Sequence, residues 1–115
     1  MYADDPVAIY LSEMAKVSPL TRDQERECVR HIRDRDERAE LAKTDLVEAN
    51  LALVVSIIEK HPSDRIHILD LIQKGNEALM QAIDVFVESG AGDFSAFAAP
   101  LIERAILDAI TTPER

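Results

Sequence analysis

The sequence has one cysteine and three histidines, side chains that could supply metal ligands or a nucleophile: Cys28, His31, His61 and His67. A zinc ion needs three or four such ligands at set spacings, and neither these residues nor the scattered carboxylates form that pattern. One cysteine also excludes an internal disulfide. We therefore expect no metal site, and we interpret Cys28 as a small apolar residue of a helix.

Catalytic patterns are missing as well. The three glycines cannot build a phosphate-binding loop, because such a loop follows a β-strand and no run in the sequence predicts one. The carboxylates are scattered over polar faces instead of forming a pair suited to acid–base work. The sequence therefore argues against a metal- or nucleotide-dependent enzyme, and we expect no cofactor and no small-molecule ligand.

The remaining kind of function is recognition of a partner, and residues 68–86 are the candidate segment for it. Read as a helix, they place an apolar stripe on one side: Ile68, Ile72, Gly75, Leu79, Ala82, Ile83 and Phe86. The other side is polar: Asp70, Gln73, Glu77 and Gln81. Leu69, Asn76 and Met80 fall on the flank between them. An adaptable methionine among amides and carboxylates is unusual on a solvated face. The flank is either a docking surface or, as periodicity alone favours, part of a core stripe that Leu69 and Met80 widen.

The composition predicts an all-α fold. The chain has 115 residues, enough for one domain with a modest core. Aromatic residues make up 4% of it, glycine and proline are scarce, and β-branched residues do not alternate with polar ones. We expect residues 1–115 to form a single compact bundle of about five helices.

Charge and hydropathy limit the partners. A net charge of −9 repels nucleic acid unless basic groups cluster locally. The apolar runs are too short to span a bilayer, and the first residues lack the pattern of a signal peptide. We therefore expect a cytoplasmic protein without a membrane partner.

Helix-start signals divide the N-terminal third. Acidic residues before Pro6 suit the entry of a short helix, whose apolar stripe is Val7, Tyr10, Leu11 and Met14. After Pro19, Thr21 and Gln24 have the spacing of a capping box, so a charged helix should begin there. A connection is expected at Asp34–Arg35, and Asp36 could cap the next helix. The arginines of the charged helix alternate with acidic residues, which favours a solvated face over a nucleic-acid patch.

A longer helical pattern continues from Glu37 to about Lys60. Residues 46–58 are apolar on nearly all sides, so this part should be surrounded by other helices. Asn50 is a lone amide there, and we expect a neighbouring backbone group to satisfy it. Pro62 should end the helix, and Asp64 should help to cap the next one.

The last helix should span about residues 94–110, after a glycine-containing loop. Its apolar stripe is Ala98, Ile102, Ala105, Ile106 and Ala109. Pro100 lacks an N–H and crowds the carbonyl of Ala96. Either the helix kinks there, or a short turn over residues 94–98 precedes a helix that has Pro100 at its first position.

Four segments resemble, in order and spacing, the bacterial housekeeping-type sigma factors: DPVAIYLSEMAKVSPLTRDQE, LVEANLALVVSIIEKH, ILDLIQKGNEALMQAIDVF and DFSAFAAPLIERAILDAI. The combination of EANLALVVSI with LDLIQKGN is highly specific for that family. Residues 5–35 resemble the segment just upstream of the second sigma domain, and residues 36–110 resemble most of that domain. The resemblance implies an all-helical fold.

The resemblance also implies a partner, core RNA polymerase, whose largest subunit offers a clamp coiled coil to the helix at residues 68–86. Carried over position by position, the polymerase-binding residues are Leu51, Val54, Asp70, Gln73, Asn76 and Met80. The last four coincide with the polar side and flank found from periodicity, whereas the first two could equally belong to the core. Lys74 stands where the family usually has Glu, and such a charge reversal can weaken an interface or change its partner.

Promoter DNA is implied much more weakly. In the family, the last helix and the loop before it hold a melted strand through aromatic stacking and basic residues. Here Phe94 and Phe97 keep two of the aromatic positions, and Arg104 is a positively charged residue. Pro100 and Leu101 stand where the family has a pair of tryptophans. Acidic residues outnumber basic ones in this part, although phosphate binding needs cations. We expect weak promoter binding, with both phenylalanines packed inward against residues 68–86.

Two functions follow from these observations. The first is a sigma-type initiation factor, or part of one, with weakened recognition and melting of the promoter hexamer nearest the start site. The second is a sigma-like regulator or adaptor without DNA binding, which competes for polymerase or binds another helical protein.

Overall fold

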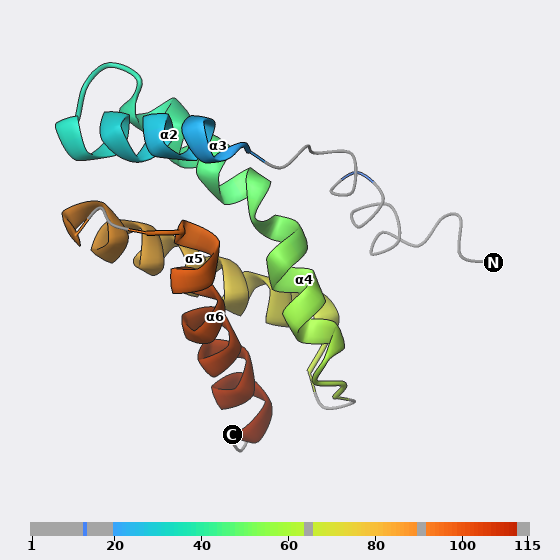
Figure 1. Cartoon of the computed structure of the whole chain (residues 1–115). Coiled ribbons are helices and arrows are strands. Elements are labelled where there is room, and N and C mark those ends of the chain that lie inside the picture. The colour runs from blue at the N-terminus through green and yellow to red at the C-terminus, as the bar shows by residue number, and fades with distance from the viewer. Residues whose placement is uncertain (1–12, 14–19, 64–65, 90–91, 113–115) are drawn as a thin grey trace.

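Helices provide all of the regular structure in the described part of the chain. The computed structural model describes residues 13, 20–63, 66–89 and 92–112. Its helices are α2 (Arg22–Asp34), α3 (Ala39–Ala49), α4 (Leu51–Glu59), α5 (Ile68–Ser89) and α6 (Phe94–Thr111) (Figure 1). This confirms the all-α bundle of about five helices. The expected helix around residues 7–14 lies outside the described residues, apart from Glu13, which is helical.

α2 and α3 form a helical hairpin. α2 begins at the predicted capping box, in which Thr21 Oγ1 accepts the N–H of Gln24 at 3.1 Å and Gln24 Oε1 accepts the N–H of Thr21 at 2.9 Å. It ends at Arg35, whose left-handed φ of 52° reverses the chain. Asp36 then accepts the N–H of Arg38 at 2.9 Å, and α3 returns beside α2 (Figure 1).

A break at Asn50 divides the helix expected between Glu37 and Lys60. Asn50 has φ −109° and ψ 7°, and its N–H donates to Val47 at 3.0 Å instead of Leu46. The side-chain Nδ2 of Asn50 donates to the Leu46 carbonyl at 2.8 Å. The side chain thus satisfies the carbonyl that the main-chain N–H of Asn50 would bind in a continuous helix. The expectation of a buried amide satisfied by the backbone is confirmed, but a continuous helix is wrong, and α4 leaves α3 in a new direction (Figure 1).

The core is built around α5, which contacts α2, α3, α4 and α6. The predicted stripe is buried except for Ile68, which is half-buried. Gly75 lets α4 approach closely, because a Cβ added there would lie 2.5 Å from Val54 Cγ1. The predicted cap Asp64 lies outside the described residues, and His67 Nδ1 accepts the N–H of Leu69 at 3.1 Å at the start of α5.

α6 runs through its proline. Asp93 caps it by accepting the N–H of Ser95 at 3.0 Å, and the helix continues past Pro100 to Thr111. The alternative of a short turn followed by a new helix is therefore wrong. Ala96 and Pro100 are both exposed, so the hydrogen bond that proline removes lies where water can solvate the carbonyl. Among the described helices, none has the length and apolar content needed to cross a bilayer.

Candidate protein-docking surface

The solvent-facing side of α5 mixes apolar and polar side chains. Leu69 is 40% exposed and Met80 is 45% exposed, so the interpretation that they widen the core stripe is wrong. Leu69, Gln73, Asn76 and Met80 are spaced four, three and four residues apart, which places them in one line along the helix. We define the α5 edge as this line together with its acidic neighbours: Leu69, Asp70, Gln73, Asn76, Glu77 and Met80.

Asn76 differs from the other residues of the α5 edge because its side chain is not fully exposed. It is half-buried, and its Oδ1 is buried without a hydrogen-bond partner among the described residues. A buried polar atom without a partner costs about 1–3 kcal/mol. Within the part of the chain that the structure describes, this acceptor is thus unsatisfied and lies in a line of exposed side chains.

The two remaining candidates for polymerase binding lie on α4 and differ in accessibility. Leu51 is half-buried and packs against the edge of the core. Val54 has no exposed surface and belongs to the core, where it faces Gly75. Of the six residues carried over from the resemblance, Val54 therefore has the core role that the sequence left open, and it offers no surface to a partner in this conformation.

The phenylalanines expected near DNA pack inward. Phe94 is fully buried, and its ring meets Phe86 edge to face, with centroids 5.3 Å apart. Phe97 is half-buried, with its centroid 5.4 Å from that of Phe86. The expected packing against α5 is confirmed, so Phe94 cannot stack on a base without leaving the core. Stacking normally contributes about 1–3 kcal/mol per base.

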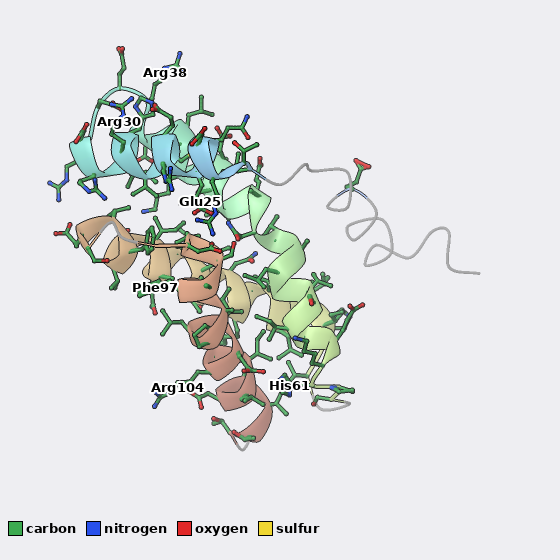
Figure 2. All side chains as sticks on the ribbon, in the orientation of Figure 1. Glu25, Arg30, Arg38, His61, Phe97 and Arg104 are labelled. Atoms are coloured by element: carbon green, nitrogen blue, oxygen red, sulfur yellow. The ribbon has the colours of Figure 1, made fainter. Side chains whose placement is uncertain are left out.

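Charge on α6 and its preceding loop is mostly negative. Arg104 is exposed and projects from α6 (Figure 2), and it is the only basic residue between positions 88 and 112. Glu103 is held by His61, whose Nε2 lies 2.8 Å from its Oε2. A single cation against several carboxylates gives little neutralisation for a phosphate backbone.

Long-range polar contacts attach the α2–α3 hairpin to α5 and α6. Arg33 Nε donates to the Val87 carbonyl at 2.8 Å, and the N–H of Phe94 donates to Glu25 Oε2 at 3.2 Å. Glu25 lies on the side of α2 that faces α6 (Figure 2). Sequence analysis placed these side chains on a solvated face and missed their role, because their partners lie far away along the chain.

The cations of α2 are largely paired within the helix. Arg30 lies 2.8 Å from Glu27 and 3.6 Å from Asp34, and the hydrogen bond from Arg30 is the main reason that the pKa of Glu27 is lowered. Arg26 lies 3.6 Å from Asp23. This pairing agrees with a solvated face and leaves few free charges for nucleic acid.

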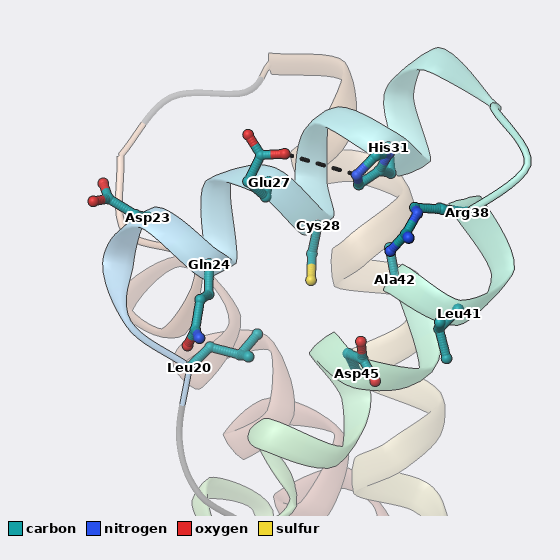
Figure 3. A pocket seen from close by; sticks show the side chains of 10 residues that line it. All are labelled: Leu20, Asp23, Gln24, Glu27, Cys28, His31, Arg38, Leu41, Ala42 and Asp45. Atoms are coloured by element: carbon teal, nitrogen blue, oxygen red, sulfur yellow. Dashed lines mark ion pairs between the residues drawn. The ribbon is translucent and has the colours of Figure 1, made fainter.

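A hollow between α2 and α3 brings the single cysteine close to a histidine and carboxylates (Figure 3). Cys28 is buried, and burial, followed by the nearby Asp45, raises the pKa of its thiol. The thiolate needed for nucleophilic attack or metal binding is therefore disfavoured. No group of three or more possible metal ligands occurs in the described part of the chain, and the interpretation of Cys28 as a small apolar residue is confirmed.

The chain is similar to proteins of a known family. The model of sigma-70 region 2 matches residues 46–115, and the model of sigma-70 factor region 1.2 matches residues 5–38. The chain belongs to the sigma-70 family. The resemblance to housekeeping-type sigma factors found in the sequence is thereby confirmed.

Similar sigma-70 proteins include the RNA polymerase sigma factors SigA of Lactococcus lactis subsp. cremoris and of Lactococcus lactis subsp. lactis strain IL1403, each 41% identical over 112 residues. SigA of a Bacillus species is 40% identical over the same length. These alignments cover 97% of this chain but only 29–31% of the relatives. The chain therefore spans about a third of the length of the curated relatives it matches.

Proposed function

We propose that this chain is a sigma-type initiation protein, or part of one, that binds core RNA polymerase through the α5 edge. The observation that carries the proposal is the exposure of Leu69 and Met80 in line with Gln73 and Asn76, in a chain of the sigma-70 family. The opposite face of α5 is buried in the core, so a partner of this helix would contact its exposed side. The clamp coiled coil of the largest polymerase subunit is the proposed contact.

Two variants of the α5 edge test the docking assignment. Asp70→Ala and Gln73→Ala remove exposed groups, so each should weaken the Kd for core polymerase about 5–10-fold, the size of a moderate interface contact. Gln81→Ala is the control, because it removes another exposed amide of α5 that is not part of the defined edge. All three should keep the wild-type unfolding midpoint.

Comparison with Gln81→Ala also shows which result would contradict the docking assignment. Equal affinities for wild type, Gln73→Ala and Gln81→Ala would show that polymerase does not use this edge. Unfolding of the domain by Asp70→Ala would equally remove the assignment, since it would give that residue a structural role.

The proposed promoter role is weakened recognition and melting of the hexamer nearest the start site. It is supported by the burial of Phe94 and by the single exposed Arg104 on an acidic helix. The polymerase complex should therefore bind promoter-like single-stranded DNA weakly. Few phosphate contacts also predict a shallow dependence of affinity on salt between about 50 and 200 mM.

The same features favour the second function, a sigma-like regulator that binds polymerase, or another helical protein, without binding DNA. The DNA titration separates the two: weak, salt-dependent binding supports the initiation role, and no contribution of this chain to DNA binding supports the regulator. Tight binding with a steep salt dependence would contradict both.

A further inference from the structure

We infer that the hollow between α2 and α3 receives an amphipathic helix of a protein partner, whose apolar stripe is flanked by lysine or arginine residues. We call this space the hairpin hollow. It is lined by residues of α2, of α3 and of the chain next to their first residues. None of these residues belongs to α5, so the inference does not depend on the proposed contact between the α5 edge and polymerase.

Apolar side chains line much of the hairpin hollow. Cys28 and Ala42 are buried between the two helices, but neither belongs to the main hydrophobic core around α5. The sulfur of Cys28 points into the hollow (Figure 3). Leu41 lines it with 59% of its surface exposed, the largest exposed fraction among the large hydrophobic residues of the described chain. An apolar occupant would remove this surface from water.

The dimensions of the hairpin hollow suit a helix. Its lining residues on α2 extend from Asp23 to His31, a length of about 12 Å or two helical turns. α3 lies beside α2 and supplies the other wall (Figure 3). A groove between two packed helices is a common docking place for a third helix, which inserts side chains spaced three or four residues apart.

The electrostatic field in the hairpin hollow is negative. Asp45 lies on its α3 wall and takes part in none of the ion pairs found among the described residues. Burial raises the pKa of the Cys28 thiol, and the further causes are the carboxylates of Asp45, Glu25 and Glu27. Arg38 lines the end of the hollow next to the turn. Basic residues of the occupant therefore belong nearer to Asp45, with which one of them would pair.

The same charges argue against two occupants that this sequence itself offers. In a symmetric contact, a second copy would bring the same carboxylates to face those of the hollow. The chain before Leu20 contains the amphipathic stripe expected around residues 7–14, but it has three carboxylates and only one lysine. Like charges brought together weaken both contacts, whereas a basic partner helix is attracted.

A synthetic peptide is the probe for this inference. It is a helix of about 18 residues with leucines in one stripe, lysines beside them and one tryptophan. This chain has no tryptophan and a single cysteine, so peptide fluorescence measures binding to the full chain and a maleimide labels Cys28 alone. The peptide should bind and slow this labelling at least 3-fold, because it covers the thiol. The same peptide with glutamates instead of lysines should bind at least 10-fold more weakly.

Leu41→Ser tests the apolar part of the contact. It should raise the Kd for the basic peptide about 10-fold, the effect of losing a central apolar contact. Val85→Ser is the matched control, because Val85 is 58% exposed and lies on α5, outside the hairpin hollow. It should change the Kd less than 2-fold. Both positions are exposed, so both variants should keep the wild-type unfolding midpoint.

Asp45→Lys tests the charge. It should raise the Kd for the basic peptide at least 5-fold at low salt, and added salt should reduce the difference from wild type. Glu48→Lys makes the same reversal at another exposed carboxylate of α3, outside the hairpin hollow, and should change the Kd less than 2-fold.

Several results would overturn the inference. If the basic peptide does not bind, binds all variants equally or leaves the labelling of Cys28 unchanged, the hairpin hollow is not a docking site. Equal binding of the acidic peptide would contradict a basic occupant. If Leu41→Ser abolishes self-association of the chain, the occupant is a second copy. If Leu11→Glu speeds the labelling without peptide, the occupant is the chain's own N-terminal segment. Failure of core polymerase to bind would overturn only the proposed function.

Discussion

Helix α2 differs from the exposed surface at the beginning of α5 and the end of α6 in how its charges are paired. On α2, Arg30 is shared between Glu27 and Asp34. On the exposed side of the α5–α6 pair, Asp70, Lys74 and Asp108 have no ion-pair partner among the described residues. A partner gains little from charges that are already paired within a helix. The number of charges on a surface therefore does not by itself indicate a binding site.

The two regions also differ in how they are anchored. α2 buries only Cys28 and Val29, whereas α5 buries nine residues. The hairpin compensates with polar bonds to the rest of the molecule, including Lys43 to Asp84 at 3.3 Å. We expect α5 to hold the fold together and the hairpin to contribute less to stability.

Shortening one buried side chain in each region tests this difference. These substitutions should have the largest effect on stability. Leu79 is fully buried on α5, so Leu79→Ala should lower the free energy of unfolding by about 2–5 kcal/mol through loss of apolar burial and a cavity. Val29→Ala on α2 should lower the free energy of unfolding clearly less, because it removes less buried apolar surface. Urea titration measures both, and equal losses would remove the distinction between the regions.

Close packing of α4 on α5 predicts the next effect. Gly75→Ala should destabilise by about 1–3 kcal/mol, because the new Cβ meets Val54 Cγ1 at 2.5 Å. This clash opposes the helix propensity gain of about 1 kcal/mol. Adding Val54→Ala should remove the clash, so thermal unfolding of the double variant should show less loss than the two single changes added together.

Asn76 provides a smaller effect that sharpens the comparison. Asn76→Leu removes the unsatisfied buried oxygen, so it should raise the free energy of unfolding by about 1 kcal/mol. The same change should weaken binding to core polymerase, because the amide lies on the α5 edge. Chemical unfolding and a binding titration on one sample check both; tighter binding would contradict a role for the amide in docking.

The turn of the hairpin predicts the smallest effect, a pH dependence. The hydrogen bond from His31, at 2.6 Å, is the largest cause of the lowered pKa of Asp36. A carboxylate with a lowered pKa in the folded state stabilises above its unfolded pKa of about 3.9, and this contribution is lost as the pH falls below that value. Wild type should thus unfold at a higher temperature than Asp36→Asn near pH 6, and the difference should vanish near pH 2. If the difference in unfolding temperature were the same at both pH values, it would not arise from the charge of Asp36.

Local patterns in the sequence predicted the helical segments, apart from the break at Asn50, and most positions of the α5 edge. The capping box at Thr21 and the stripe of α5 depend on contacts three or four residues apart, which spacing alone reveals. The same spacing placed Gln73 on the polar side of α5. It could not decide whether Leu69 and Met80 were core or surface, because that depends on which side of α5 the other helices cover.

Tertiary structure decided the rest. The break at Asn50 arises where its side chain donates to Leu46 and accepts from Ser95, 45 residues away. The burial of Val54 follows from the close approach that Gly75 permits. Sequence by itself thus determined which residues form helices and which faces are apolar, since these follow from neighbours along the chain. Which polar groups remain unpaired is a property of residues that only folding brings together.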